Sequence, residues 1–277
     1  MKDSTEPSAG IATDPIWREY LDTARPIAQA AGDLLARHFG ETRSIELKGA
    51  INLVTEMDRR AEELIVSRLA QAFPDFVVVA EEGSDRDSAS EFAWYVDPLD
   101  GTTNYAHGLP VFCVSLGLWR GDQPICGIVH QPLAQEMFTA VRGNGAYCND
   151  TLLHVTPTPD LGSALLATGF PYDIRDTTID NIDHFTHFAK RARAIRRMGA
   201  AALDLAYTAA GRFDGFWEMK LAPWDLAAAV LLCTEAGAVV TDFRGQPFDL
   251  KRGQAVAANA ALHAQMLEVV ARGRFPE

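Results

Sequence analysis

Residues 94–105 read Trp-Tyr-Val-Asp-Pro-Leu-Asp-Gly-Thr-Thr-Asn-Tyr, and we expect the fold to be organised around the bend that this stretch predicts. Apolar residues over 93–96 predict a buried strand that ends at Asp97. Pro98 fixes its own φ and favours extended geometry for the residue before it, so the chain leaves the strand in a rigid bend. Gly101 has no Cβ to keep a ligand from the backbone, and Thr102 begins a short helix whose first N–H groups lack partners within the helix.

The bend presents groups of opposite character side by side. Asp97 and Asp100 provide carboxylates for a cation, whereas N–H groups at the start of a helix attract an anion such as phosphate. A plain turn would explain the proline and the glycine, but it would not explain both aspartates together with Thr102. We therefore hypothesise a metal and phosphate site here, with a structural turn as the alternative reading.

Two further carboxylates occupy comparable places. Glu81 follows an apolar strand expected over 76–80, and Asp225 lies at the start of an apolar helix expected over 224–236. If both converge with Asp97 and Asp100, each unscreened pair repels by about 3 kcal/mol at ~5 Å and an effective dielectric of ~20. Such a cluster requires cations or protons, and all-oxygen ligands favour Mg²⁺ or Mn²⁺ over zinc. Taken alone, Asp225 would be interpreted as a helix N-cap.

The rest of the chain predicts layers of helix and sheet, an α+β architecture. Further helices are expected over 14–40, 58–73, 177–190, 199–210 and at the C-terminus. Strands are expected over 44–48, 164–168, 194–197, 213–217, 238–241 and 255–258. Turn signals at 121–122 and 143–145 predict consecutive antiparallel strands between 111 and 149. We expect a disordered tail at 1–13 and one domain at 14–277, made of a metal and phosphate half (about 14–150) and a substrate half (about 151–277).

The composition and net charge limit which kinds of partner the protein is expected to bind. The chain has 277 residues and a net charge of −12, which argues against general affinity for nucleic acid or anionic membrane. The best apolar run, 226–233, is too short to cross a bilayer, and the first residues lack the apolar core of a signal peptide, so a cytoplasmic protein is expected. The cysteines show no zinc or redox spacing and are expected to be buried small hydrophobes: Cys113, Cys126, Cys148 and Cys233.

Two other clusters of charged or polar residues are interpreted as solvent-exposed surface rather than as binding sites. The basic run 190–197 predicts a solvated helix end followed by a strand, with nucleic-acid or partner contact as the alternative. His184 and His187 share one helical face near Asp183, but no third zinc ligand is evident. We therefore expect that face to be polar and exposed.

Two signatures of this sequence resemble those of the lithium-sensitive, magnesium-dependent inositol monophosphatases. The first is residues 94–105, and the second is Trp224-Asp225-Leu226-Ala227-Ala228-Ala229 with its continuation Glu235-Ala236-Gly237-Ala238. The acidic pair Glu81-Glu82 lies upstream in the family's order, and the resemblance runs from about Ile16 to the C-terminus. It implies a layered αβαβα sandwich of the sugar-phosphatase type and a homodimer.

The resemblance also implies a set of metal ligands. Glu81, Asp97 and the Leu99 carbonyl would hold a first Mg²⁺, and Asp97, Asp100 and Asp225 would hold a second. A third, weaker ion would also depend on Glu81, so two or three Mg²⁺ ions per site are expected, with Mn²⁺ as a substitute.

The remaining roles implied by the resemblance concern phosphate and water. The N–H groups of Gly101 and Thr102 would bind the phosphate, next to Asp100. Thr102, oriented by Asp58, would position the attacking water together with Glu81. The reaction implied is an in-line displacement by water without a covalent intermediate.

The substrate is the least determined part of this reading. Glu218 matches a glutamate that binds ring hydroxyls in inositol-phosphate enzymes, and Gly199 and Ala201 match residues on the sugar side of the pocket. This favours myo-inositol 1-phosphate, although residues 169–175 depart from the animal enzymes. Related enzymes act on fructose 1,6-bisphosphate, histidinol phosphate, adenosine 3′,5′-bisphosphate or NADP, and these remain alternatives.

The alternative from a different class of function is that the chain is a regulatory binding protein on a phosphatase scaffold, for instance one that binds the transcription machinery. Such a protein would not need a complete set of metal ligands. Here every ligand is present, which favours the enzyme.

Overall fold

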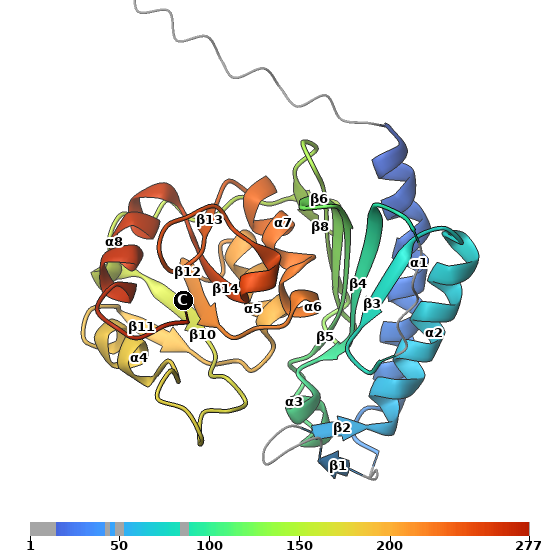
Figure 1. Ribbon diagram of the computed structural model, residues 1–277, viewed down its shortest axis with the longest axis horizontal. Coiled ribbons are helices and arrows are strands. Elements are labelled where there is room, and N and C mark those ends of the chain that lie inside the picture. The colour runs from blue at the N-terminus through green and yellow to red at the C-terminus, as the bar shows by residue number, and fades with distance from the viewer. Residues whose placement is uncertain (1–14, 42–44, 48–52, 84–88, 277) are drawn as a thin grey trace, which may run out of the picture.

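The computed structural model describes residues 15–41, 45–47, 53–83 and 89–276. Figure 1 shows five layers: a helix pair, a seven-stranded sheet, a middle layer of helices, a five-stranded sheet and a second helix pair. This is the αβαβα sandwich that the resemblance implies. The tail predicted at 1–13 lies outside the described residues.

The first helix pair covers the outer face of the larger sheet. Helix α1 (Pro15–His38) begins with proline, whose missing N–H has no helical partner at that position in any case. It ends before Gly40, whose φ of 81° is left-handed. Helix α2 (Glu56–Ala72) packs beside it and follows a short antiparallel pair, β1 (Ile45–Leu47) and β2 (Leu53–Thr55).

The larger sheet takes all its strands from residues 77–152, in the order β3-β4-β5-β6-β7-β8-β9. The strands are β3 (Val77–Ala80), β4 (Phe92–Asp100), β5 (Cys113–Arg120), β6 (Gln123–Gln131), β7 (Glu136–Val141), β8 (Ala146–Cys148) and β9 (Thr151–Leu152). Only β3 and β4 run parallel, so the expected series of antiparallel strands is confirmed. The Glu235 carboxylate anchors the turn between β7 and β8 by accepting the N–H groups of Gly143 and Gly145 at 2.7 and 2.8 Å.

The smaller sheet takes its strands from residues 165–258, in the order β11-β10-β12-β14-β13. The strands are β10 (Leu165–Thr168), β11 (Ala194–Arg196), β12 (Gly215–Met219), β13 (Val239–Thr241) and β14 (Gln254–Ala258). Helices α4 (Ile182–Ala189) and α8 (Ala260–Val270) cover its outer face in Figure 1. There the Phe188 ring stacks on Trp217 with centroids 4.0 Å apart.

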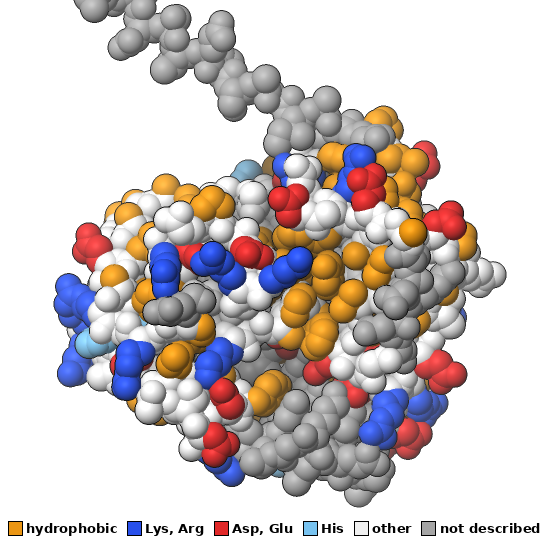
Figure 2. Space-filling view, in the orientation of Figure 1, with side chains coloured by type: hydrophobic (Ala, Val, Ile, Leu, Met, Phe, Trp, Pro, Cys, Tyr) orange, Lys and Arg blue, Asp and Glu red, His pale blue; other side chains and the backbone are white. Residues whose placement is uncertain are grey.

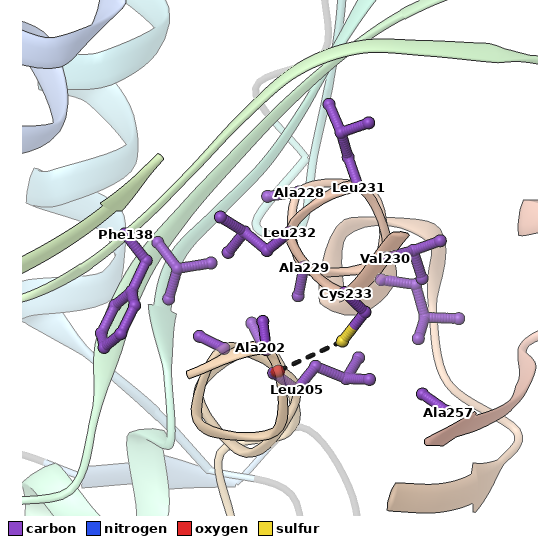
Figure 3. Packing of buried hydrophobic residues seen from close by; sticks show 14 of the residues in the cluster. Phe138, Ala202, Leu205, Ala228, Ala229, Val230, Leu231, Leu232, Cys233 and Ala257 are labelled. Carbon is purple, nitrogen blue, oxygen red and sulfur yellow. Dashed lines mark hydrogen bonds between the residues drawn. The ribbon is translucent and has the colours of Figure 1, made fainter. Parts of the chain in front are cut away.

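The middle layer contains α5 (Ala201–Ala209), α6 (Pro223–Leu226) and α7 (Ala229–Glu235). Figure 3 shows apolar side chains of α5 and α7 packed together, with Phe138 of the larger sheet and Ala257 of the smaller sheet beside them, and the Cys233 thiol donating to the Leu205 carbonyl at 3.2 Å. Glycines in the larger sheet permit this close approach. A Cβ on Gly117 would lie 2.6 Å from the Ala227 carbonyl carbon, so any other residue would push the helices off the sheet.

Most expected elements are found within about two residues of their predicted bounds, and the clearest differences are as follows. The strand expected to end at Asp97 continues to Asp100, and the strand expected over 213–217 is β12, which ends at Met219. The helix expected over 224–236 is broken between α6 and α7, where the Ala227 carbonyl accepts the indole N–H of Trp119 at 3.0 Å. The helix expected from 177 begins only at Ile182, because Asn181 before it is left-handed and its side chain is buried.

Three of the four cysteines are buried as expected, Cys148 is partly exposed, and all four are free. The expectation of an exposed histidine face is wrong for His184, which is buried between the rings of Phe243 and Phe275. The basic run is a helix end followed by β11, with Arg193 and Arg196 exposed, as expected. In Figure 2, basic and acidic side chains are interspersed on the face shown. No helix in the described ranges combines the length and apolar character needed to span a bilayer.

Candidate active site

A cavity of about 490 Å³ lies where the two sheets and the middle helices meet. Its wall is formed by Glu81 and by four segments far apart in the sequence: 97–104, 169–174, 197–204 and 218–225. Every predicted site residue lines this cavity except Asp58, which contacts it through Thr102. The structure therefore brings together all the residues that the sequence singled out.

The bend at the end of β4 is part of the sheet rather than a loop after it. Asp97 pairs with Ser115 and Asp100 with Cys113, and the register shifts between them. The one extra residue of β4 forms a bulge-like irregularity, and both carboxylates line the cavity. Asp97 is almost fully buried, and its Oδ1 accepts the Leu99 N–H at 3.0 Å.

Asp100 joins the bend to the middle layer. Its carboxylate accepts three N–H groups at the start of α5, at 2.8 to 3.4 Å, from Ala201, Ala202 and Leu203. The Cys113 thiol also lies 3.5 Å from Asp100 Oδ2, so Cys113 has a polar contact that a merely hydrophobic role does not explain. Burial raises the pKa of Asp100 to about 6 even though these donors lower it.

Asp225 is the third residue of α6, where its Oδ2 accepts the Ala222 N–H at 2.7 Å. The N-cap of α6 is Ala222, so the local reading of Asp225 as the N-cap is wrong: Asp225 lies at the third helical position and accepts the N–H of the N-cap residue. Burial raises its pKa well above the ordinary range, and the charges of Asp100 and Glu81 raise it further. The Asp225 carboxylate thus both binds the N–H before α6 and belongs to the carboxylate cluster.

Asp97 shows that the four carboxylates act on one another. Burial raises its pKa well above the ordinary range, and three neighbouring charges add to the effect: Glu81, Asp100 and Asp225. Within the described residues, no three His, Cys, Asp or Glu side chains stand at the mutual distances of a formed metal site. The carboxylates line a shared cavity, and three of them, Asp97, Asp100 and Asp225, also accept backbone N–H groups.

The donor set fits a hard divalent cation. Only oxygen ligands are present, which suits Mg²⁺, and the mutual repulsion of the carboxylates is what a bound cation would relieve. A carboxylate oxygen that accepts one N–H keeps a further lone pair, so the bonds of Asp100 and Asp225 to the backbone do not exclude coordination.

Gly101 is required by packing as well as by conformation. Its φ is 92°, and an added Cβ would lie 2.9 Å from the Val111 carbonyl oxygen and 3.3 Å from the Ala200 Cβ. The sequence predicted glycine at 101 because a ligand must approach the backbone. Packing and the positive φ require glycine there as well. After Gly101 the expected short helix is present as α3 (Thr102–Ala106).

Thr102 is held from two sides. Its Oγ1 lies 2.7 Å from Asp58 Oδ1 and 3.0 Å from the Leu99 carbonyl oxygen. One hydroxyl has one proton, and the shorter contact favours donation to Asp58. The lone pairs of Thr102 then remain available to accept a proton from a water in the cavity.

Glu218 faces the cavity from β12 and is almost fully buried. Burial raises its pKa to about 8, and the charge of Asp100 contributes while that of Arg197 opposes. An added Cβ on Gly169 would lie only 2.0 Å from Glu218 Oε1. Glycine at 169 is therefore what allows the segment after β10 to lie directly on the Glu218 carboxyl.

Several cavity residues were missed at the sequence level, among them Asp204 and Arg197. Asp204 is buried on α5, and its Oδ1 has no hydrogen-bond partner among the described residues; burial followed by the charge of Glu218 raises its pKa well above the ordinary range. A lone acid inside the apolar run 200–206 was the available signal. Arg197 lines the same side of the cavity as Gly199 and Ala201, but the basic run around it concealed its position.

Comparison with known proteins agrees with this geometry. The family model of the inositol monophosphatase family matches residues 16–273. The chain is 39% identical to an inositol-1-monophosphatase from Synechocystis over 254 residues, covering 91% of this chain and 88% of the relative. It is 42% identical to the Nus factor SuhB of Pseudomonas aeruginosa over 259 residues, covering 90% and 95%.

The solved structure of an inositol monophosphatase from Anabaena superposes with a TM-score of 0.85 at 35% identity, over 93% of this chain and 97% of that one. The match therefore extends through both sheets and all the segments that line the cavity. The chain belongs to the inositol monophosphatase family, whose members are phosphatases that hydrolyse phosphate monoesters.

Proposed function

We propose that this protein hydrolyses the phosphate monoester of a small polyol in a Mg²⁺-dependent reaction, with myo-inositol 1-phosphate as the preferred substrate. The observation that carries the proposal is that Glu81, Asp97, Asp100 and Asp225 line the same cavity as Glu218. This supports the proposal because four side chains that could bind cations and one that could bind a hydroxyl share a single cavity.

The ligand assignment follows the family resemblance. A first Mg²⁺ would be held by Glu81, Asp97 and the Leu99 carbonyl, and a second by Asp97, Asp100 and Asp225. A third ion would depend on Glu81, and Mn²⁺ would substitute. When bound, such cations supply Lewis acidity that stabilises charge on the attacking and departing oxygens.

The chain's own groups would orient the reactants. Donation from Thr102 to Asp58 fixes the hydroxyl so that its lone pairs face the cavity, where with Glu81 they would hold the attacking water. The N–H groups of Gly101 and Thr102 at the start of α3 would bind phosphate oxygens.

Glu218 is the proposed selector of the leaving group, with Gly199 and Ala201 completing that side of the cavity. A pKa of about 8 keeps its carboxyl largely protonated at neutral pH, so it can both donate to and accept from a ring hydroxyl. A buried carboxyl discriminates strongly because a substrate without the hydroxyl leaves it unpaired.

The test is phosphate release from a panel of esters with Mg²⁺, with Mn²⁺ and with the metal chelated. The panel comprises myo-inositol 1-phosphate, fructose 1,6-bisphosphate, histidinol phosphate, adenosine 3′,5′-bisphosphate, NADP and glycerol 2-phosphate. We expect the highest kcat/KM for inositol 1-phosphate and no turnover after chelation. A higher kcat/KM for another ester would replace the substrate, and turnover after chelation would contradict the metal requirement.

Glu218→Gln tests the selector. We expect it to lower kcat/KM for inositol 1-phosphate by about tenfold or more while glycerol 2-phosphate changes much less. Equal losses on both esters would remove Glu218 from substrate selection.

A second candidate is a binding function beside catalysis, favoured by the 42% identity to a protein named Nus factor SuhB. The homodimer remains an expectation from the family resemblance, as does lithium inhibition. A binding function would persist in Asp225→Asn, which we expect to be catalytically impaired. Loss of binding in that variant would tie the two functions to one site.

A further inference from the structure

Part of the cavity wall comes from residues 169–174, which include two aromatic residues, Phe170 and the more exposed Tyr172. Tyr172 lines the cavity, yet 62% of it is exposed. A large aromatic side chain at the rim of a water-filled site is available to cover whatever binds inside. Hydrophobic surface left open in this way is common where a ligand completes the packing.

The base of the segment is fixed by a buried asparagine. Asn181 is fully buried, and its Nδ2 donates to the Gly169 carbonyl at 2.6 Å and to Thr168 Oγ1 at 2.9 Å. Its Oδ1 in turn accepts the indole N–H of Trp217 at 2.9 Å. The chain therefore leaves β10 in one defined direction.

The far part of the segment is fixed by an ion pair. Lys220 Nζ lies 2.7 Å from Asp173 Oδ2 and 3.3 Å from Thr177 Oγ1. Lys220 belongs to the link between β12 and α6, and its φ of 59° directs it toward Asp173 from an uncommon left-handed backbone. The Ile174 N–H also donates to the Pro171 carbonyl at 3.1 Å. Tyr172 thus sits in a turn held on both sides.

Tyr172 lines the same cavity as the four carboxylates. A tyrosine phenol has an ordinary pKa of about 10, so the hydroxyl keeps its proton at neutral pH and can donate. Partial desolvation at the cavity rim, followed by the charges of Glu81, Asp225, Asp100 and Asp97, raises this pKa further. Among the described residues no hydrogen bond ties the Tyr172 hydroxyl to the protein, and Tyr172 is part of the wall of the cavity in which phosphate would bind.

We propose that Tyr172 is a substrate-contacting residue whose hydroxyl donates to a phosphate oxygen of the ester and whose ring covers the leaving group. The proposal rests on the phosphatase function above. The unprotonated oxygens of a phosphate accept hydrogen bonds, and the phenol O–H of Tyr172 can donate one. The ring of a cyclitol or sugar presents C–H groups that would pack on the aromatic face.

Two variants separate the two contacts. Tyr172→Phe removes the donor and keeps the ring, so KM should rise by about tenfold for inositol 1-phosphate and glycerol 2-phosphate alike. Because the bond forms in both the ground and transition states, kcat should change little. Tyr172→Ala should raise KM by about three- to tenfold more, and only for inositol 1-phosphate, since glycerol has no ring to cover.

Binding of inorganic phosphate in Mg²⁺, measured by calorimetry, gives a readout that does not need turnover. We expect about tenfold weaker binding in Tyr172→Phe and unchanged binding in Tyr147→Phe, a tyrosine outside the cavity wall. Equal affinities in the wild type and Tyr172→Phe would overturn the proposal. If the wild type binds phosphate through Tyr172 but cleaves no ester, the proposed function fails and the contact stands.

Variants of Lys220, which pairs with Asp173, test whether Tyr172 has only a structural role. Lys220→Met should raise KM for inositol 1-phosphate by releasing the turn, and Lys220→Arg should restore it. If Tyr172→Phe instead lowers Tm as far as Tyr172→Ala does and reduces kcat for every ester, Tyr172 acts through the fold and the contact is refuted.

Discussion

Thr102 and Asp58 are joined by a 2.7 Å hydrogen bond although they lie 44 residues apart in the sequence. Asp58 comes from the first turn of α2, and Thr102 is the first residue of α3. The bond fixes the orientation of one hydroxyl at the edge of the cavity. A side chain held this way can position water without moving during the reaction.

Thr102→Val keeps the shape of the side chain and removes the hydroxyl. We expect kcat to fall by about 10²-fold because the attacking water loses its orientation, while Thr102→Ser retains most of the activity. The measurement is kcat at saturating Mg²⁺ and substrate. An unchanged kcat in the valine variant would exclude Thr102 from the mechanism.

Asp225→Asn should abolish most Mg²⁺-dependent turnover without unfolding the protein. The amide oxygen of asparagine can still accept the Ala222 N–H that Asp225 now accepts at 2.7 Å, so α6 keeps its cap. Asp249→Asn is a matched control, because Asp249 accepts the Lys251 N–H at 2.9 Å outside the cavity wall. Near-normal turnover of Asp225→Asn at saturating Mg²⁺ would argue against Asp225 as a ligand.

Glu218→Gln should stabilise the metal-free protein, and the gain should depend on pH. The pKa of Glu218 is raised from 4.5 to about 8 in the folded state, so ionisation costs stability as pH rises through this window. The variant and the wild type should melt together at pH 4.5, and the variant should melt higher at pH 8. The expected difference is at least about 3 °C, since 1 kcal/mol shifts Tm of a chain of this size by about 2–4 °C. The measurement is Tm in the presence of a chelator from pH 4.5 to 8. If the pKa of Glu218 were not raised, the difference in Tm between the variant and the wild type would stay constant over this range.

Gly169→Ala should act through Glu218 alone. All three atoms that the new Cβ would approach most closely belong to that carboxyl, which can move because it ends a side chain. We expect discrimination between inositol 1-phosphate and glycerol 2-phosphate to fall by about tenfold. In the double variant with Glu218→Ala, the effect of Gly169→Ala should vanish, because the two residues act as one unit. Additive losses would contradict this, and Gly162→Ala serves as a control away from the cavity.

The fold class and the site residues could be predicted from sequence because their signals are local and strong. The 94–105 stretch combines a strand, a proline bend and a helix start within twelve residues, and each part has its own steric cause. The helix break after Leu226 could not be predicted, because it involves an indole from β5. The late start of α4 likewise depends on the burial of Asn181 under Trp217.

The sequence by itself determined the layered architecture, the four acidic residues of the site and the family, since periodicity and short motifs encode these directly. Only the tertiary structure decided that Asp204, Arg197 and Tyr172 share the cavity, that Glu218 rests on Gly169, and that Lys220 holds the Tyr172 turn. These relations join residues tens of positions apart. They depend on packing between sheets and helices, which no local pattern specifies.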